Sequence, residues 1–271
     1  MPKISVVMPV YNTKEEWLRE AIESILNQSY KDFEFIIIDD GSDKSIEPIV
    51  NSYNDARIVL IRQENQGIAK SLNYGFKISK GEYIARMDSD DISMPERFEK
   101  QVNFLDKNPQ ISVLGAWFET FPDKHVYKHP ENPKYSDFLN YCCIAHPSVM
   151  LRRLDFKKYN LYYNPKYKCE DYELWSRAVR ILDFYNLQEV LLKYRVHSSN
   201  ASKPNPDFDA DVAKVRQNML DYLSGNSLLG KLKIIKRKIK NRIKKVSFFT
   251  LFFVNSQKSS IFVPMYTMNF T

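Results

Sequence analysis

Cysteine is scarce in this chain of 271 residues, which contains three of them. The number is odd, and the spacing fits neither a disulfide framework nor a metal site. We therefore expect Cys142, Cys143 and Cys169 to be buried or inert, as in a protein from a reducing compartment.

Long apolar runs are also missing. No uninterrupted run reaches the roughly 18 residues that a membrane-spanning helix needs, and the first residues lack the pattern of a secretory signal. With 44% hydrophobic and 27% charged residues, the sequence predicts a globular protein of one large α/β domain or two small ones. We expect a cytoplasmic location.

Acidic residues are absent from residues 222–271, which hold ten lysines and arginines. Taking these ten charges from the net charge of +7 leaves −3 for residues 1–221. This distribution argues against a nucleic-acid-binding catalytic face, and no nucleic-acid partner is predicted.

The same tail has apolar residues at steps of three and four from Leu228 to Val246, and nine basic residues lie within 231–245. This pattern predicts a helical basic tail that lies on an anionic membrane surface through residues 228–271. A helix docked on the protein's own acidic surface is the alternative. We expect a division into 1–110 for nucleotide-sugar binding, 111–221 for acceptor binding within the same catalytic domain, and 222–271 for the tail.

Short apolar runs alternate with helical patterns in the first part of the chain. Strands are predicted at 4–10, 35–38, 57–61 and 82–88, and a capping box over 13–16 predicts the start of the first helix. The alternation favours an α/β fold with a mostly parallel sheet flanked by helices. Further strands are expected at 111–118, 147–151 and 186–196.

Polar clusters follow three of these strands. They are Tyr11-Asn12, Asp39-Asp40-Gly41-Ser42 and Asp88-Ser89-Asp90-Asp91. Ligands of such sheets bind beyond the carboxyl ends of the strands, so we expect the three clusters to share one rim.

The third cluster predicts a metal site. Alternation along a strand would place Asp88 and Asp90 on one side, where their oxygens suit Mg²⁺ or Mn²⁺ bound to a diphosphate. The alternative is the N-terminus of a helix that begins near Pro95, with Ser89, Asp90 or Ser93 as its cap.

These motifs resemble those of family 2 glycosyltransferases, which have the GT-A fold and transfer a sugar from a nucleotide donor with inversion. The order of the motifs matches the family's from Pro9 to His197. The matching stretches are Pro9–Asn12, Asp39–Ser42, Asn65–Gly67, Leu72–Gly75, Asp88–Asp91, Glu170–Asp171 and Tyr194–His197.

The resemblance implies a role for each matching position. Asp88 corresponds to the nucleotide-facing member of the metal-binding DxD motif and Asp90 to its metal ligand, with His197 as a further metal or diphosphate contact. Asp171 corresponds to the general base, and Glu170 is expected to position either Asp171 or the acceptor. Many members have Arg where this chain has Leu72, so the cationic contact to the donor is either absent or supplied by Lys70. The implied donor-binding residues are Pro9, Tyr11, Asp39, Asp40, Asn65, Gly67, Lys70, Asp88, Ser89 and Arg195.

Without the resemblance, Asp171 would be read as an acidic residue that stabilises a helix N-terminus, and His146 as a loop histidine bonded to backbone. Trp117 and Trp175 would be core residues.

The function that the resemblance implies is transfer of galactose, glucose or an N-acetylhexosamine from a UDP-sugar to a saccharide or lipid-linked saccharide, in synthesis of surface polysaccharide, capsule or lipopolysaccharide. A nucleotidyltransferase acting on sugar phosphates is an alternative, but the Gly-rich and basic nucleotide loop expected near its first strand is missing. A non-catalytic nucleotide-sugar-binding protein would tolerate loss of Asp90 or Asp171, and both are present.

Overall fold

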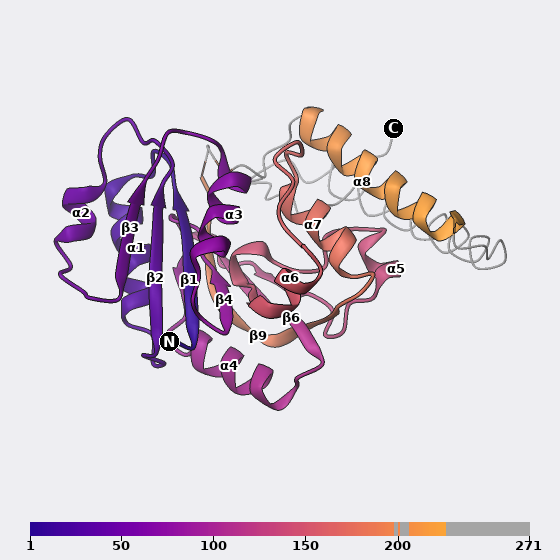
Figure 1. Cartoon of the computed structure of the whole chain (residues 1–271), viewed down its shortest axis with the longest axis horizontal. Helices are drawn as coiled ribbons and strands as arrows, with labels where there is room; N and C mark the ends of the chain where they lie inside the picture. Colours follow the sequence, from indigo (N-terminus) through magenta and orange to yellow (C-terminus); the bar gives the residue numbers. More distant parts are fainter. Residues whose placement is uncertain (198–199, 201–205, 226–271) are drawn as a thin grey trace.

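A computed structural model describes residues 1–197, 200 and 206–225. The tail helix predicted within residues 228–271 lies outside these described residues. A nine-stranded sheet has the order β3-β2-β1-β4-β8-β6-β9-β5, and β7 pairs with β6 (Figure 1). The strands are β1 (Ile4–Val10), β2 (Phe33–Asp39), β3 (Ile58–Arg62), β4 (Tyr83–Arg86), β5 (Ile92–Ser93), β6 (Ile111–Phe121), β7 (Val126–Tyr127), β8 (Met150–Arg152) and β9 (Asp183–Arg195).

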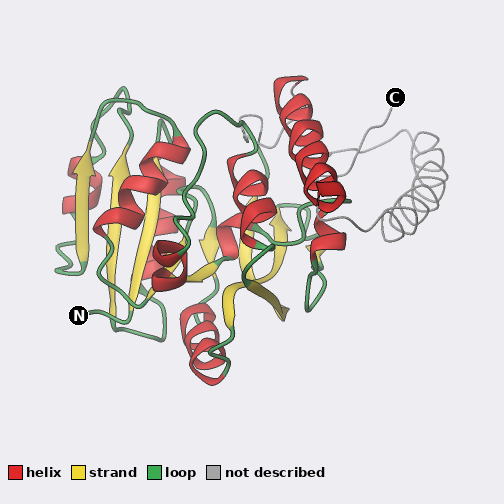
Figure 2. Ribbon diagram, turned by 45° about the vertical axis from the view of Figure 1, so that its right-hand side comes forward, coloured by secondary structure: helices red, strands yellow, loops and turns green. Residues whose placement is uncertain are grey.

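Helices cover both faces of the sheet (Figure 2). They are α1 (Glu15–Leu26), α2 (Glu47–Asn51), α3 (Ile68–Ile78), α4 (Arg97–Lys107), α5 (Tyr135–Phe138), α6 (Arg153–Lys158), α7 (Glu170–Ala178) and α8 (Pro206–Gly225), with a 3₁₀ turn η1 (His146–Ser148).

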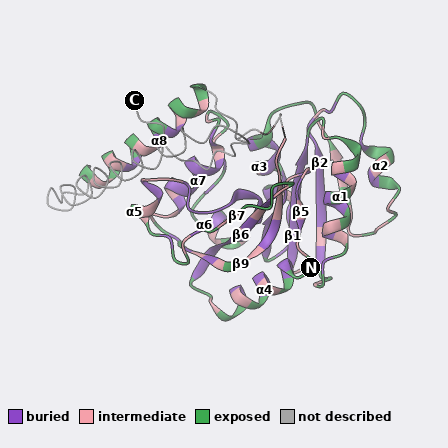
Figure 3. Ribbon diagram, turned by 180° about the vertical axis from the view of Figure 1, so that it is seen from behind, coloured by how far each residue is buried: buried purple, intermediate pink, exposed green. Residues whose placement is uncertain are grey.

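Strands β3, β2, β1 and β4 are parallel and form the part of the sheet that carries the predicted polar clusters. All seven residues of β1 are buried, since helices cover it on both sides. Val6 and Met8 pack with the apolar stripe of α1, whereas Val7 packs with α3 on the other face. The alternating side chains of one strand thus belong to two cores. Figure 3 shows β1 coloured as buried.

The second half of the sheet is mixed. Strand β8 is antiparallel to both β4 and β6, whereas β9 runs parallel to β6. Across the described residues, four of the eight pairings are antiparallel. The α/β fold is confirmed, but the sheet is more mixed than the alternating pattern suggested, because an apolar run does not specify the direction of its strand.

Helix α8 was not anticipated from the sequence. Val212, Val215 and Met219 are buried against the core that contains α7, and the helix continues to Gly225, past the expected start of the tail at residue 222. Among the helices in the described ranges, none is both long and apolar enough to cross a membrane.

Candidate active site

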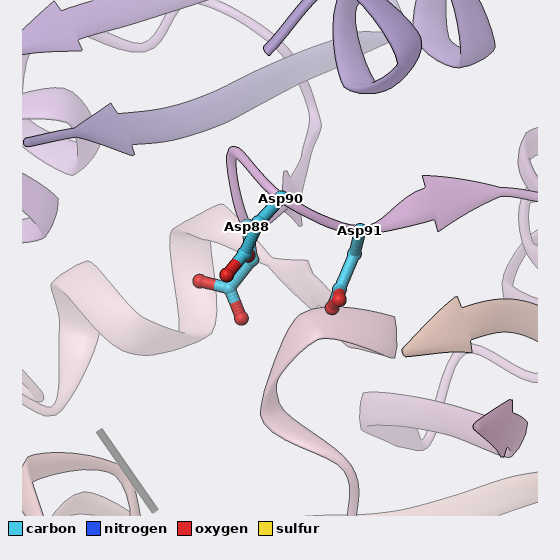
Figure 4. A group of neighbouring side chains, drawn as sticks. All are labelled: Asp88, Asp90 and Asp91. Carbon is cyan, nitrogen blue, oxygen red and sulfur yellow. The ribbon is translucent and has the colours of Figure 1, made fainter. Parts of the chain in front are cut away.

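Three carboxylates meet in the turn between β4 and β5. One oxygen from each of Asp88, Asp90 and Asp91 lies within 4.8 Å of the others, and we call these residues the acid cluster (Figure 4). Strand β4 ends at Arg86, so a turn, and not the strand alternation expected from the sequence, brings Asp88 and Asp90 together.

Each carboxylate of the acid cluster has a different partner. Asp88 accepts a hydrogen bond from the guanidinium of Arg86, and Asp90 Oδ2 lies 2.8 Å from His197 Nε2. Asp91 Oδ1 accepts the backbone N–H of Arg195 at 2.9 Å. The other oxygen of Asp91 is buried and has no hydrogen-bond partner within the part of the chain that the structure describes.

Burial raises the pKa of Asp88 and raises that of Asp91 well above its usual range. The charge of Asp90 adds to the shift at Asp91, while Arg86 opposes the shift at Asp88. Three crowded oxygen ligands and an unpartnered carboxylate oxygen fit a hard divalent cation such as Mg²⁺ or Mn²⁺, whose charge would relieve the repulsion.

The end of β9 is bound to α1 beside the acid cluster. The ring of His197 packs on Trp17 with centroids 4.6 Å apart, and Asn200 Oδ1 accepts the His197 backbone N–H at 2.6 Å. Arg195 does not line the cleft as a donor contact would. Its Nε donates to the Asp90 carbonyl at 2.7 Å, and its guanidinium pairs with Glu20. Arg195 and Trp17 therefore position His197 and Asp90.

The rim of the cleft is built around Asp40. Its carboxylate accepts the backbone N–H groups of Gln66 at 3.0 Å and Gly67 at 2.8 Å, together with the side-chain amide of Gln63 at 2.7 Å. Gly67 has φ of +87°, a left-handed conformation that glycine adopts without strain. These contacts shape the loop before α3, and we call residues 39–67 the rim segment.

Besides Arg195, two further predicted donor-binding residues, Asp39 and Lys70, do not line the cleft. Asp39 accepts the Ser42 N–H at 2.9 Å and pairs with Arg62 at 2.7 Å. Arg62 lies next to Asp39 in the register of β3 and β2. The sheet therefore supplies the ion-pair partner that holds the Asp39 side chain away from the cleft. Lys70 is exposed on α3.

The other predicted residues border one cleft of about 720 Å³. Its walls include Pro9, Tyr11, Asp40, Asn65, Gly67, Asp88, Ser89, Asp90, Glu170, Asp171 and His197. Tyr11 is 53% exposed, so its ring is accessible for stacking. Thr13, which the sequence assigned to a helix cap, instead hydrogen bonds with Ser89 at 2.6 Å, because α1 begins two residues later at Glu15.

Two adjacent acids begin α7 on the wall of the same cleft. Asp171 is buried, and its Oδ1 accepts the backbone N–H of Tyr172 at 2.7 Å. Glu170 is half-buried, and burial followed by the charge of Asp171 raises its pKa to about 8. A helix N-terminus favours ionised carboxylates, but burial and the charge of Asp171 outweigh this effect at Glu170.

Arg86 and His146 are cleft residues that sequence reasoning did not include in the site. Arg86 is buried, and its charge opposes the upward pKa shifts of both Asp88 and Glu170. His146 lies 2.8 Å from the Tyr163 hydroxyl, rather than bonding to backbone as expected, and burial lowers its pKa well below the usual value. Arg86 could have been included in the predicted site from the sequence, because it lies two residues before Asp88 at the end of the same predicted strand.

A family model described as Glycosyl transferase family 2 matches residues 5–175. An uncharacterized glycosyltransferase of Methanocaldococcus jannaschii is 39% identical over 212 residues, which cover 72% of this chain and 71% of the relative. The O-antigen biosynthesis glycosyltransferase WbnJ of Escherichia coli is 34% identical over 211 residues, which cover 74% of this chain and 82% of the relative.

Two solved structures share the fold. TarS 1–349 of S. aureus, crystallised in complex with UDP-GlcNAc, aligns with a TM-score of 0.69 and 20% identity over 80% of this chain and 66% of that one. The mannosyltransferase PcManGT of Pyrobaculum calidifontis, in complex with GDP-Man and Mn²⁺, aligns with a TM-score of 0.58 and 13% identity over 89% of this chain and 81% of that one.

Proposed function

Because the chain belongs to glycosyltransferase family 2 and is a glycosyltransferase, we propose that it moves a sugar from a UDP-sugar to a saccharide acceptor with inversion. The observation that carries this proposal is the shared cleft. It is bordered by Asp40, Asn65 and Gly67 of the rim segment, by Asp88 and Asp90 of the acid cluster, and by Asp171.

On the donor side, we assign the uracil to the rim beside Tyr11 and Asp40. The diphosphate would lie next to Asp88, Ser89 and Asp90, and these carboxylates together with His197 would hold a Mn²⁺ or Mg²⁺ ion. The ion, when bound, supplies positive charge that neutralises the departing UDP, so no protein acid is needed at the leaving group.

On the acceptor side, Asp171 takes the proton from the attacking hydroxyl. Inversion by a single displacement needs one base, and Asp171 lines the cleft at the N-terminus of α7, which favours its ionised form. Glu170, with its pKa raised to about 8, holds a proton at neutral pH and can donate a hydrogen bond that orients the acceptor.

Uridine is preferred here to guanosine because the higher-scoring structural match carries UDP-GlcNAc, although the mannosyltransferase match carries GDP-Man. The transferred sugar is proposed to be galactose, glucose or an N-acetylhexosamine. Similarity to an O-antigen biosynthesis enzyme supports an acceptor that belongs to a surface polysaccharide. We place the enzyme at the inner face of the cell membrane, attached through the basic and apolar sequence of 228–271.

The direct test is nucleotide release. The protein is incubated with Mn²⁺ and individual UDP- and GDP-sugars, with and without a saccharide acceptor, and free nucleoside diphosphate is measured. We expect release from one UDP-sugar that requires the metal and increases with acceptor. Release from GDP-mannose alone would replace the donor assignment, and no release from any sugar nucleotide would contradict the proposed reaction.

A further inference from the structure

One part of the cleft wall contributed by the second half of the chain is aromatic. Phe118 of β6, Tyr194 of β9 and His129, which follows β7, all line the cleft. The ring centroid of Phe118 lies 5.6 Å from that of Tyr194 and 5.9 Å from that of His129. Tyr127 stacks on Phe118 at 4.8 Å and 7° between ring planes, which supports the wall from behind. We call Phe118, His129 and Tyr194 the aromatic wall.

His129 has a feature that packing alone does not explain. Its side chain is 7% exposed, yet among the described residues neither ring nitrogen has a hydrogen-bond partner. The backbone beside it is firmly held, because the His129 carbonyl accepts from Trp117 Nε1 at 3.0 Å and from Gln188 Nε2 at 3.3 Å. A buried polar group without a partner destabilises the fold, so an apolar ring would suit this position better if only stability mattered.

The chemistry of this wall selects a class of ligand. Burial lowers the pKa of His129 to about 4, so the ring is neutral at physiological pH and offers one N–H donor and one acceptor nitrogen. A sugar hydroxyl, which both donates and accepts, matches this pair, whereas a phosphate or carboxylate would favour a cation. The aromatic faces of Phe118 and Tyr194 are suited to packing against the C–H face of a pyranose.

The aromatic wall lines the same cleft as the proposed base, Asp171. Cys142, another cleft residue, has its thiol pKa raised by burial and then by the charge of Asp171. Ile144 and Ala145 continue the lining from Cys142 toward His146. The wall and the proposed base therefore border a common space.

We propose that Phe118, His129 and Tyr194 form the subsite for the acceptor, and that this subsite takes an uncharged hexose or N-acetylhexosamine unit whose hydroxyls hydrogen bond with His129. This inference rests on the proposed function, because it names the acceptor class of the same cleft.

The test compares His129→Phe, which keeps a ring but removes both nitrogens, with His129→Gln, which keeps a donor and an acceptor. His125→Phe is the matched control, since His125 lies four residues earlier, just before β7, is exposed and does not line the cleft. With UDP and Mn²⁺ present, binding of methyl glycosides of glucose, galactose, N-acetylglucosamine and N-acetylgalactosamine is titrated beside methyl glucuronide and glucose 1-phosphate. UDP affinity and Tm are measured for each protein.

We expect the wild-type protein to bind at least one neutral glycoside more tightly than either charged compound. His129→Phe should weaken that binding by about 10-fold, with unchanged UDP affinity and an equal or higher Tm, and His129→Gln should retain part of the binding. A purely structural histidine would instead lower the Tm and weaken UDP and glycoside binding together.

Three results would overturn the subsite. They are equal glycoside affinity in His129→Phe and wild type, tighter binding of a charged compound, or no binding of any neutral glycoside by a wild-type protein that binds UDP. Absence of UDP binding by the wild type would instead refute the donor assignment, so failures of the two proposals can be told apart.

Discussion

Asp40, in the rim segment, and Asp91, in the acid cluster, are both buried carboxylates, but their surroundings differ. Asp40 accepts three hydrogen bonds from Gln63, Gln66 and Gly67, all within the rim segment itself. Asp91 accepts one backbone N–H and has a second oxygen without a partner among the described residues, next to the charges of Asp88 and Asp90.

This difference distinguishes two kinds of carboxylate. One kind forms its hydrogen bonds within the protein and stabilises a loop, and the other has an oxygen available for a ligand. Fixed N–H donors satisfy the carboxylate oxygens of Asp40 whether or not a ligand is bound, so Asp40 holds a stable loop against which a nucleotide can bind. Arg86 relieves the repulsion within the acid cluster only in part, and the remaining repulsion is the expected cost of a site built for a cation.

The largest effect is expected outside both regions, at the proposed base. Asp171→Asn should lower turnover by roughly 10²- to 10⁴-fold while UDP-sugar affinity stays near normal, because only the proton acceptor is lost. Steady-state kinetics and donor titration check both quantities. If transfer continues at the wild-type rate, the base is another group and Glu170 is the first candidate.

The acid cluster should control metal-dependent binding. Asp90→Ala removes a proposed ligand and the partner of His197, so Mn²⁺-dependent affinity for the UDP-sugar should fall by at least about 100-fold. Calorimetric titration with Mn²⁺ and with EDTA measures the metal-dependent part. Asp123→Ala, at an exposed acid of the second half, is the control and should leave binding intact. Retained Mn²⁺-dependent affinity in a folded Asp90→Ala protein would contradict the metal site.

A substitution in the rim segment should lower the free energy of unfolding by the same amount with and without metal. Asp40→Asn weakens the charge-assisted hydrogen bonds from Gln66 and Gly67, and we expect the free energy of unfolding to fall by about 1.5–3 kcal/mol. Urea denaturation in Mn²⁺ and in EDTA should give the same loss. A loss seen only in one of the two conditions would mean that Asp40 belongs functionally to the acid cluster.

A smaller effect concerns pH. The pKa of Glu170 is raised from 4.5 to about 8, so the folded state favours the protonated carboxyl, and this stabilisation is lost as pH rises from about 4.5 through 8. Glu170→Gln lacks this titration. Measured in EDTA, its Tm should fall less between pH 5 and pH 9 than that of the wild type. Parallel curves for the two proteins would show that Glu170 has an ordinary pKa.

The smallest effect on transfer is expected from removal of the tail. Truncation after Ser227 should spare transfer to a soluble acceptor, because every proposed catalytic residue precedes it, and should release the protein from anionic vesicles. Co-sedimentation at low and high salt compares the two forms, and salt should weaken binding of the full chain. Equal binding by both forms, or binding by neither, would refute attachment through 228–271.

Local sequence patterns were sufficient for much of the fold. Buried apolar runs identified β1, β2, β3 and β4 to within a few residues. The reason is that the signals for a strand and for the turn that ends it lie within a few consecutive residues of the sequence. The order of the polar clusters after these strands also indicated a common rim, because parallel strands present their carboxyl ends at the same edge. The motifs then identified the family, which the family model confirms.

Tertiary contacts decided which of these residues share the cleft. Adjacent acids in the sequence are separated in space: Arg62, brought alongside by β3, holds Asp39, while Asp40 faces the loop that closes over it. His197 reaches Asp90 across 107 positions of the chain, and His129 acquires its role only where β6 and β9 bring their aromatic residues beside it. The amino-acid sequence by itself determined where strands end and which chemical groups follow them, because those signals are local. Partners, burial and the protonation they impose depend on segments far apart in the chain, so only the folded structure could decide them.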